Sequence, residues 1–411
     1  MTRRSALAAG FTVLFVTTGV NLSFGILFKP MLLSLGSDRS TLALAATAGL
    51  MVNAFGQPVF GTLIDKVGPR RVILPSMALM VVGIALVSLA ERPWQLILLY
   101  GVVAAIGYTG CTLLPVSVHV RRWFPAERGF VMALAASGFS LGQLVFSQLA
   151  ARLVTAVGWR ATYLVLAAIL GGFLALFTAW LRDAPTRAAQ PAGGPSGGST
   201  PAPAAAPRAD TRTMPGGARS LDRRGALRTT AFWAMTVGLM GCGFTDFLLT
   251  THLPAYAADL GFPPAVAANA LSLWAAANVV GILLAGSVAT RIGARWALVL
   301  TYGLRAASLF YLLTAGTPAQ LYFFAILFGA TFFTTAPLSS TLVGTLFGPL
   351  HHGMIFGAAN LFHHTAGALG SYAGGIVFDW TGSYRAIFLA SALIATGSGL
   401  VTSLARRPAR P

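Results

Sequence analysis

The sequence has few charged residues and very few acidic ones. Only 9% of its 411 residues are charged, and Asp and Glu together number 10. Soluble globular domains carry about 25% charged residues, so this composition cannot cover a surface that faces water. Only two cysteines are present, Cys111 and Cys242, and both lie in apolar runs, so no disulfide framework is indicated. The shortage of charge excludes a soluble globular protein.

Apolar residues are abundant and lie in long continuous runs. They make up 56% of the chain, and the mean hydropathy is +0.74. A membrane-spanning helix needs about 20 apolar residues, so with loops the chain has room for about twelve spans. The polar breaks predict helices at 7–35, 41–62, 72–90, 95–119, 128–152, 160–181, 230–258, 264–290, 296–315, 318–346, 353–378 and 384–404. We therefore predict an all-α membrane protein with twelve transmembrane helices.

The basic residues predict how the helices are oriented. With the N-terminus inside, 21 Lys and Arg residues fall on the cytoplasmic side and five on the outside, which satisfies the positive-inside rule. The net charge of +18 is therefore a topology signal and does not indicate nucleic-acid binding. Arg3 and Arg4 resemble the start of a secretory or twin-arginine signal. No clear cleavage site precedes Lys29, so this run is interpreted as an uncleaved first helix.

One segment differs from the rest in composition. Residues 183–227 are rich in Pro, Gly, Ala and Ser, which is typical of a flexible linker because such a stretch buries too little apolar surface to fold. The segment separates predicted spans six and seven. We therefore predict a six-helix N-terminal bundle at 1–182, a cytoplasmic linker at 183–227 and a six-helix C-terminal bundle at 228–411.

The two predicted bundles repeat each other. Gly61–Arg71 follows span two, and Gly286–Trp296 follows span eight, 225 residues later. The pairs Trp159-Arg160 and Tyr384-Arg385 recur at the same spacing of 225 residues, as do Leu35-Gly36 and Leu260-Gly261. Parallel six-helix halves of this kind are typical of transporters that bind substrate near the middle of the bilayer.

The segment Gly61–Arg71 resembles the signature loop of the major facilitator superfamily, G-x-x-x-D-[RK]-x-G-x-[RK]-[RK], at every defined position. The copy in the second half has Thr290 in place of the acid. The segment Arg122–Gly129 resembles the superfamily's loop between helices four and five. The resemblance implies the two-bundle fold and a gating role, near the helix ends and the anionic membrane surface, for Gly61, Asp65, Gly68, Arg70 and Arg71. A purely topological loop of fixed charges is the alternative.

Three further stretches resemble the monocarboxylate and oxalate/formate branch of this superfamily. They are Phe24–Pro30, Gly158–Arg160 and Asp379–Tyr384. Members of that branch carry small organic anions, often with protons. The helix-eight arginine that the branch uses for a carboxylate falls near Ile282 here, and its helix-one lysine falls near Leu22. The first of these departures favours an alternative function, export of drugs or other apolar solutes by the same fold.

Three charged residues lie within predicted spans, where charge is costly and indicates function by default. Arg305, near the middle of helix nine, could bind a carboxylate or pair with Asp246. Asp246, about halfway along helix seven, could carry a proton or form a static ion pair. Lys29, late in helix one, could attract anions at the outer mouth or extend to the interface.

Histidines and uncharged polar residues complete the candidate site. His363 and His364 lie near mid-depth in helix eleven and His252 lies in the outer half of helix seven, so each could take part in proton transfer or simply bond to a neighbouring helix. Polar side chains at a similar depth could bind substrate or, equally, other helices. Those we single out as substrate-binding candidates are Asn21, Tyr108, Gln143, Asn278 and Asn360, together with Lys29 and Arg305.

These features together predict a secondary active transporter rather than an enzyme. We expect it to move a small organic anion, most simply a monocarboxylate, by alternating access with protons. No motif for a metal, a nucleophile or a nucleotide is recognised, so neither a membrane enzyme nor an ATP-driven pump is favoured, and no cofactor or metal is expected. The expected setting is the cytoplasmic inner membrane of a bacterium-like cell, with both termini cytoplasmic, a monomeric state, and the lipid bilayer as the only large partner.

Overall fold

The computed structural model describes residues 2–124, 128–180, 223–348 and 352–406, and its secondary structure in these ranges is helical throughout. In the N-terminal half the helices are α1 (Arg3–Leu22), α2 (Phe24–Leu35), α3 (Arg39–Val67), α4 (Pro69–Val87), α5 (Pro93–Leu98), a π-helical turn (Leu99–Ala104), α6 (Ala105–Thr109), α7 (Leu113–Trp123) and α8 (Arg128–Trp180). In the C-terminal half they are α9 (Arg223–Leu227), α10 (Thr230–Asp259), α11 (Pro264–Ile292), α12 (Ala294–Leu312), α13 (Pro318–Gly329), α14 (Thr335–Phe347), α15 (His352–Thr381) and α16 (Arg385–Ser403).

These helices form the twelve predicted membrane-crossing segments, so the predicted fold class is confirmed. Two predicted spans, 128–152 and 160–181, are joined as α8, which turns back at Gly158. That residue has φ 76° and ψ 170°, a backbone conformation that glycine adopts without a steric penalty. Most of the predicted linker, residues 183–222, lies outside the described residues.

Three of the crossing segments are interrupted within the ranges that the structure describes. The first breaks at Ser23 between α1 and α2, the fourth at residues 110–112 between α6 and α7, and the tenth at residues 330–334 between α13 and α14. A break frees backbone N–H and C=O groups, which in a membrane must find partners inside the protein. The tenth segment's break is the one that organises the candidate site below.

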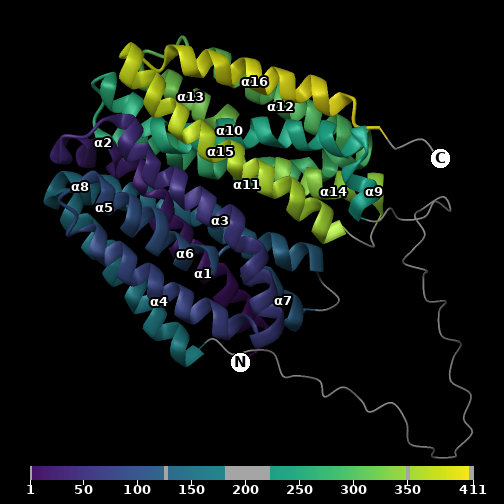
Figure 1. Cartoon of the computed structure of the whole chain (residues 1–411), viewed down its shortest axis with the longest axis horizontal. Helices are drawn as coiled ribbons and strands as arrows, with labels where there is room; N and C mark the ends of the chain where they lie inside the picture. The colour runs from purple at the N-terminus through teal and green to yellow at the C-terminus, as the bar shows by residue number, and fades with distance from the viewer. Residues whose placement is uncertain (1, 125–127, 181–222, 349–351, 407–411) are drawn as a thin grey trace, which may run out of the picture.

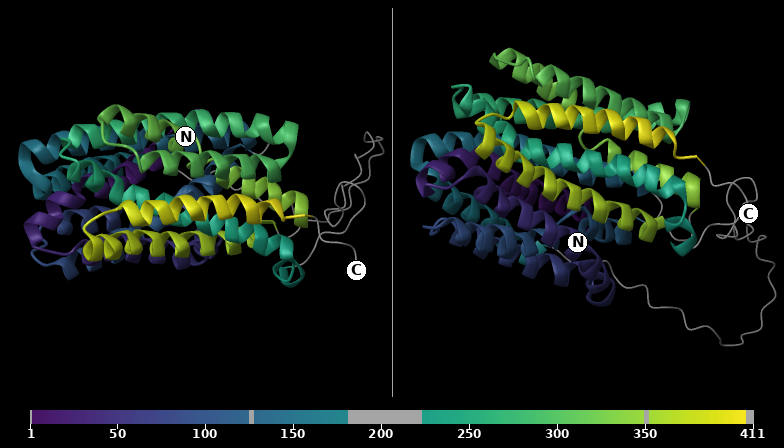
Figure 2. Two further views of the ribbon diagram at one scale, coloured as in Figure 1. Left: turned by 90° about the horizontal axis from the view of Figure 1, so that it is seen from above. Right: turned by 45° about the horizontal axis from the view of Figure 1, so that its top comes forward.

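The two halves lie side by side, with their helices running roughly along the long axis of the molecule (Figures 1 and 2). We call the end that carries Arg3, Trp180, Arg223 and Ser403 the terminal end. The opposite end carries the C-terminus of α2, the N-terminus of α3 and the C-termini of α10 and α15, and we call it the distal end.

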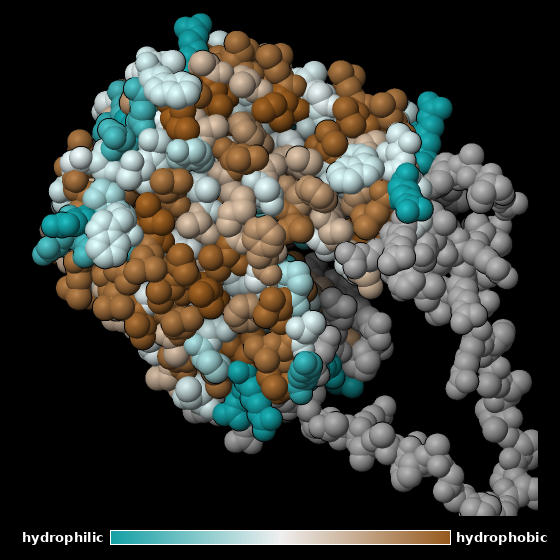
Figure 3. Space-filling view, in the orientation of Figure 1, coloured by the Kyte–Doolittle hydropathy of each residue, from teal (hydrophilic) through white to brown (hydrophobic). Residues whose placement is uncertain are grey.

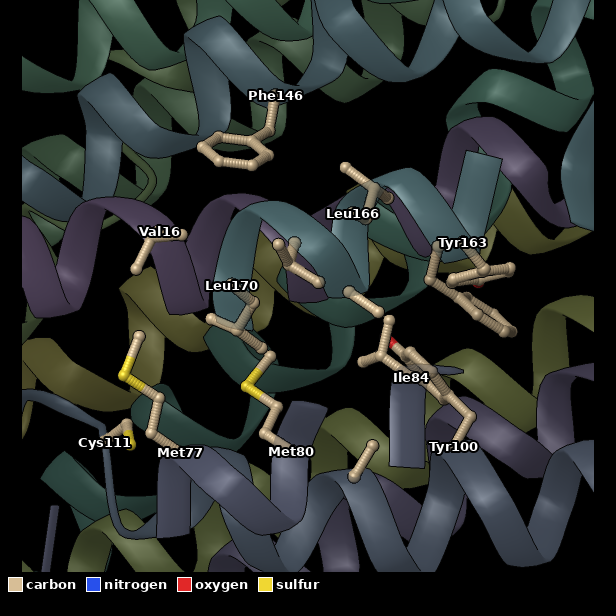
Figure 4. Close-up of a cluster of buried hydrophobic side chains, with 14 of the residues drawn as sticks. Val16, Met77, Met80, Ile84, Tyr100, Cys111, Phe146, Tyr163, Leu166 and Leu170 are labelled. Carbon is tan, nitrogen blue, oxygen red and sulfur yellow. The ribbon is translucent and has the colours of Figure 1, made fainter. Parts of the chain in front are cut away.

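Each half has its own apolar core. In the N-terminal half, Met77 and Met80 of α4 lie near Val16 of α1 and Leu166 and Leu170 of α8, as Figure 4 shows. In the C-terminal half, the Trp274 ring packs edge-on against Phe328 and Phe332, with ring centroids 4.6 and 5.0 Å apart. The two cores meet between the halves, because Ala255 of α10 packs with the N-terminal cluster and Ile26 and Ala150 pack with the C-terminal one.

The outer surface is also apolar. Large side chains such as Leu33, Leu283 and Leu400 are each at least 65% exposed, and apolar residues cover much of the face in Figure 3. Continuous exposed apolar surface on this scale is unfavourable in water and favourable in lipid. Eight of the described helical segments are long and apolar enough to cross a membrane. This count takes α8, which contains two predicted spans, as one segment. The chain is a multi-pass membrane protein.

Candidate functional site

The centre of the C-terminal half contains a buried ion pair. Arg305 of α12 and Asp246 of α10 are 2.7 Å apart between Nη1 and Oδ1, and Arg305 has no exposed surface. Cys242, one turn before Asp246, donates to its other carboxylate oxygen at 3.2 Å. The pairing that the sequence left open between these two residues is therefore present in this conformation.

Arg305 also holds the break between α13 and α14. Its Nη2 donates to the carbonyl oxygens of Thr331 and Phe332, at 2.6 and 3.2 Å. Its Nη1 donates to the hydroxyl of Thr245 at 3.1 Å. Carbonyls freed by a helix break have no helical donor, and the five N–H groups of a guanidinium are well suited to supply one. All these bonds of Arg305 are to the protein itself.

Asn278 of α11 satisfies the other side of the same break. Its Oδ1 accepts from the backbone N–H of Phe333 at 3.0 Å, and its Nδ2 donates to Ser140 of α8 at 2.9 Å. Ser140 belongs to the N-terminal half, so Asn278 joins the halves near mid-bundle. Asn278 is completely buried. Its amide is therefore used for helix and interhalf contacts in this conformation.

Gln143 of α8 is in the opposite situation. It is completely buried, and neither its Oε1 nor its Nε2 has a hydrogen-bond partner. Phe139, one turn earlier on the same helix face, packs against Phe332 and Phe333 of the other half, which places this face of α8 toward the C-terminal half. An unpartnered buried amide costs about 1–3 kcal/mol. Gln143 thus carries a buried amide without a hydrogen-bond partner on a face of α8 that turns toward the C-terminal half.

The remaining uncharged candidates are partly buried. Asn21 lies just before the break at Ser23, and its backbone carbonyl accepts from the hydroxyl of Tyr100 at 2.8 Å. Tyr100 lies in the π-helical turn and stacks on Phe24, with centroids 4.4 Å apart. Tyr108 of α6 and Asn360 of α15 are likewise partly buried.

His363 and His364 of α15 both pack against the Phe247 ring, with centroids 5.9 and 5.8 Å from it and 5.2 Å from each other. The Nδ1 of His363 bonds the carbonyl of Leu239 at 3.0 Å, and that of His364 bonds the carbonyl of Asn360 at 2.9 Å. A carbonyl only accepts, so Nδ1 carries the hydrogen in both rings and Nε2 is the nitrogen that can accept a proton.

A second charged cluster joins the halves at the distal end. Lys29 of α2 and Arg39 of α3 both contact the same oxygen, Oδ1 of Asp259 at the end of α10, at 2.9 and 2.8 Å. Asp379 of α15 accepts from the backbone N–H groups of Arg39 and Ser40, at 3.0 and 2.8 Å, and so caps the start of α3.

The cluster continues into the protein through two more side chains. Arg39 Nη1 donates to the hydroxyl of Tyr384 at 2.6 Å, and that hydroxyl lies 3.0 Å from Nδ1 of His252. His252, predicted from the sequence, thus lies beside the cluster and is fully buried. We call Lys29, Arg39, Asp259, Asp379, Tyr384 and His252 together the distal junction.

Sequence reasoning missed four members of the distal junction: Arg39, Asp259, Asp379 and Tyr384. A signal was present, because Arg39 closely follows Leu35-Gly36 and Asp259 directly precedes Leu260-Gly261, the pair that repeats 225 residues later. The repeat therefore places both charges at the same end of the bundle. Asp379 and Tyr384 lie in the segment that resembles the monocarboxylate branch.

The signature loop connects α3 and α4 at the terminal end. Gly68 has φ 88°, a value that favours glycine, and its counterpart Gly293 between α11 and α12 has φ 82°. Arg70 donates to the carbonyl of Thr178 at the end of α8, at 3.0 Å. Gly61 is partly buried and Arg71 is exposed. The side chain of Asp65 lies outside the described residues.

Within the described ranges, no group of three or more His, Cys, Asp or Glu side chains is arranged to hold a metal ion.

Comparison with known families identifies the fold. The family model described as "Major Facilitator Superfamily" matches residues 9–279 and 235–411. The chain belongs to the major facilitator superfamily. It is a membrane transporter and not an enzyme.

Individual members of the superfamily match nearly the whole chain. Monocarboxylate transporter 13 of Rattus norvegicus is 27% identical over 94% of this chain and 85% of its own length. The oxalate:formate antiporter of Oxalobacter formigenes is 22% identical over 86% of this chain and 81% of its own. A bacterial homologue of the human lysosomal transporter Spinster, solved in an inward-facing and occupied conformation, has a TM-score of 0.78 at 12% identity, with 98% of this chain and 96% of that chain covered.

Proposed function

We propose that this member of the major facilitator superfamily is a secondary active transporter that moves a small organic anion, most simply a monocarboxylate, together with protons. The names of two relatives, a monocarboxylate transporter and an oxalate:formate antiporter, support the substrate class. The proposal takes its mechanism, alternating access, from the arrangement of the two halves.

The distribution of contacts between the halves supports alternating access. Bonds between the halves run from the distal end to mid-bundle. They comprise the distal junction, the bond from Gln148 to Asn269 at 2.9 Å and the bond from Asn278 to Ser140 at 2.9 Å. Toward the end where α7 and α14 lie, the surface between the halves is hollowed (Figure 3). This conformation is therefore closed at the distal end, and opening requires the halves to part there.

The observation that carries the anion proposal is the sharing of one carboxylate oxygen by Lys29 and Arg39. When the halves part at the distal end, Asp259 leaves with the C-terminal half. Two cations then remain on the N-terminal half at the mouth of the opening, where they attract anions. Deeper between the halves, Gln143 offers an amide without a partner, and Asn21, Tyr108 and Asn360 are further candidates for contact with substrate.

The proton-coupling proposal rests on the titratable groups near mid-bundle. His363 and His364 each present an Nε2 that can accept a proton, and both lie against Phe247, next to Asp246 in sequence. Breaking the contact between Asp246 and Arg305 would free a carboxylate to accept one as well. We assign proton transfer to these groups and assign Arg305 and Asn278 to support of the broken tenth segment.

The proposed setting follows from the sequence. We place both termini and the segment 183–227 in the cytoplasm, because 21 of the basic residues fall on that side against five on the other. The distal end then faces the outside of the cell inner membrane. We propose that the protein works as a monomer with two six-helix bundles, 1–182 and 228–411, and that the loop Gly61–Arg71 takes part in gating at the cytoplasmic side.

The test uses purified protein in liposomes with a trapped pH dye. A panel of short monocarboxylates, dicarboxylates and neutral analogues is added outside, and acidification is compared with that of protein-free liposomes, because weak acids cross lipid unaided. We expect saturable, protein-dependent proton entry with monocarboxylates. Absence of such a signal with any acid, from monodisperse protein, would refute proton-coupled anion transport.

A second function, export of drugs or other apolar solutes, is favoured by one observation. Ile282 occupies the region where the monocarboxylate branch has its carboxylate-binding arginine. If the acids fail, the same liposomes loaded with apolar cations or dyes distinguish this alternative by protein-dependent efflux.

A further inference from the structure

The distal junction contains one imidazole whose two nitrogens are both engaged. Nε2 of His252 lies 2.7 Å from the carbonyl oxygen of Ser371, and Nδ1 lies 3.0 Å from the hydroxyl oxygen of Tyr384. A carbonyl oxygen can only accept, so Nε2 carries the hydrogen. In the neutral ring Nδ1 is then the acceptor, and the Tyr384 hydroxyl donates to it.

The same hydroxyl is held from the other half. Nη1 of Arg39 donates to the Tyr384 oxygen at 2.6 Å, and a guanidinium has no acceptor, so the direction of this bond is fixed. The chain of donors therefore runs from Arg39 to Tyr384, then to His252 and finally to Ser371. This order is satisfied only when His252 is neutral.

We propose that His252 is a proton-binding site that controls the distal junction, and that protonation of its Nδ1 favours separation of the halves at the distal end. A protonated ring donates from both nitrogens. The Tyr384 oxygen then receives two donors, one from His252 and one from Arg39, while its own hydrogen loses its acceptor. The contact between Arg39 and Tyr384 joins the halves, so its loss and the uptake of the proton promote each other.

The charges around His252 strengthen this coupling. The groups near it are Lys29 of α2, Arg39 of α3, Tyr256 and Asp259 of α10, Asp379 of α15, and Tyr384 and Arg385 at the start of α16, with the Phe28 ring against the imidazole. Both carboxylates are already engaged, Asp259 by two cations and Asp379 by the backbone of α3. A proton on His252 therefore adds positive charge beside Arg39 that neither carboxylate of the junction is free to offset. The carboxylate of Asp38, which precedes Arg39 in the chain, is exposed, so water and salt screen its effect.

This inference deepens the proposed function. The side of the membrane to which a protonated His252 opens the protein depends on the proposed orientation. With the distal end facing outward, an acidic exterior would open the transporter toward the side from which protons and anions are taken up. His252 would then act as a sensor for the outer gate, distinct from the mid-bundle groups proposed to carry the proton.

The test measures distal opening without any substrate. Spin labels are attached at Val157→Cys in α8 and Thr314→Cys after α12, two exposed distal positions in different halves, while the native Cys111 and Cys242 are buried. Distance distributions are recorded in nanodiscs from about pH 8 to about pH 5, a range that spans ordinary histidine titration. We expect the population with the longer distance to grow on acidification. The ratio of open to closed molecules should rise by at most about tenfold per pH unit, which is the limit when one proton is linked to opening.

Three variants isolate His252 from other titrating groups. His252→Gln keeps a donor toward Ser371 and an acceptor toward Tyr384 but takes up no proton, so the short distance should persist across the range. Tyr384→Phe removes the hydroxyl that links the imidazole to Arg39, so the long distance should be present already at high pH and change little. His352→Gln, at the terminal end, is the matched control and should respond as the wild type does.

Two results would overturn the inference. One is a wild-type distance distribution that does not change with pH. This measurement uses only the wild-type protein, so it does not depend on whether a variant folds. The other is a His252→Gln protein that keeps the wild-type response. Because the assay contains no substrate, a pH-insensitive junction in a protein that still transports acids refutes only this inference, whereas a responsive junction without acid transport refutes only the proposed substrate.

Discussion

Asp259 at the end of α10 holds Lys29 of α2 and Arg39 of α3 through a single carboxylate oxygen, at 2.9 and 2.8 Å. One side chain of the C-terminal half thus anchors two helices of the N-terminal half. Because both bonds cross between the halves, both must break whenever the distal end opens. The strength of this contact therefore enters the equilibrium between the two transport conformations directly.

We expect Asp259→Asn to shift this equilibrium toward distal opening. The pairs are partly exposed, so each is worth about 1 kcal/mol or less, and loss of both predicts a shift of roughly three- to thirtyfold. Modification of a cysteine introduced at Ser40, which is partly buried and lies against Gly375 of α15 in the other half, measures the shift. Asp38→Asn, a neighbouring exposed carboxylate, is the control and should leave the rate of modification unchanged. An unaltered rate in Asp259→Asn would contradict a role in closure.

The central pair of Asp246 and Arg305 predicts a different pattern, in stability. Removing one member of a buried pair leaves an uncompensated charge and costs about 3–5 kcal/mol, whereas replacing both with apolar residues costs much less. Arg305→Met also leaves the carbonyl oxygens of Thr331 and Phe332 without the donors that Arg305 supplies. We therefore expect Asp246→Leu and Arg305→Met each to lower the melting temperature of detergent-solubilised protein, and the double variant to recover part of the loss. Additive losses in the double variant would argue against the pairing.

The sequence was sufficient for the fold because membrane burial leaves a strong signal. Long apolar runs, the repeat at 225 residues and the Gly61–Arg71 loop predicted the crossing segments and the superfamily, and both are confirmed. Breaks within helices were not predicted, because a break such as that at residues 330–334 depends on Arg305 and Asn278 from other helices to satisfy its backbone groups.

The candidate site was only partly predictable, for a related reason. Hydropathy marks a polar residue at mid-depth, but it does not show whether a partner on another helix already uses that residue's hydrogen bonds. Asn278 and Gln143 look alike in the sequence, yet the first is bonded through both its amide oxygen and its amide nitrogen and the second has no partner. The distal junction was missed because Arg39 and Asp259 lie at helix ends, where charge is ordinary and informs topology alone.

Gln143 allows a prediction in which stability and transport change in opposite directions. An unpartnered buried amide destabilises the ligand-free protein, so Gln143→Leu should leave its melting temperature unchanged or raise it. The same change removes a donor and an acceptor from the proposed site, and we expect the half-saturating concentration of the anion to rise about tenfold or more.

The matched contrast to Gln143 is Gln148, five residues further along α8. It donates to Asn269 and Ser272 of the other half, at 2.9 and 3.0 Å, so Gln148→Leu should lower the melting temperature. A Gln143→Leu protein that is destabilised to the same degree would show that Gln143 supports the fold rather than the substrate.

The last prediction concerns a close approach of the halves at Gly25 of α2. A Cβ added there would lie 2.5 Å from the carbonyl oxygen of Thr250 in α10, so only glycine permits this distal contact. Gly25→Val should therefore keep the distal end from closing, and because overpacking costs about 1–3 kcal/mol, the closed population should fall roughly five- to hundredfold. Gly172→Val is the control, because an added Cβ there meets no atom within 4 Å. It makes the same change in helix propensity without a clash. We expect Gly25→Val to lose most transport while the spin-label distance between Val157→Cys and Thr314→Cys lengthens; a wild-type distance would mean that this contact does not limit closure.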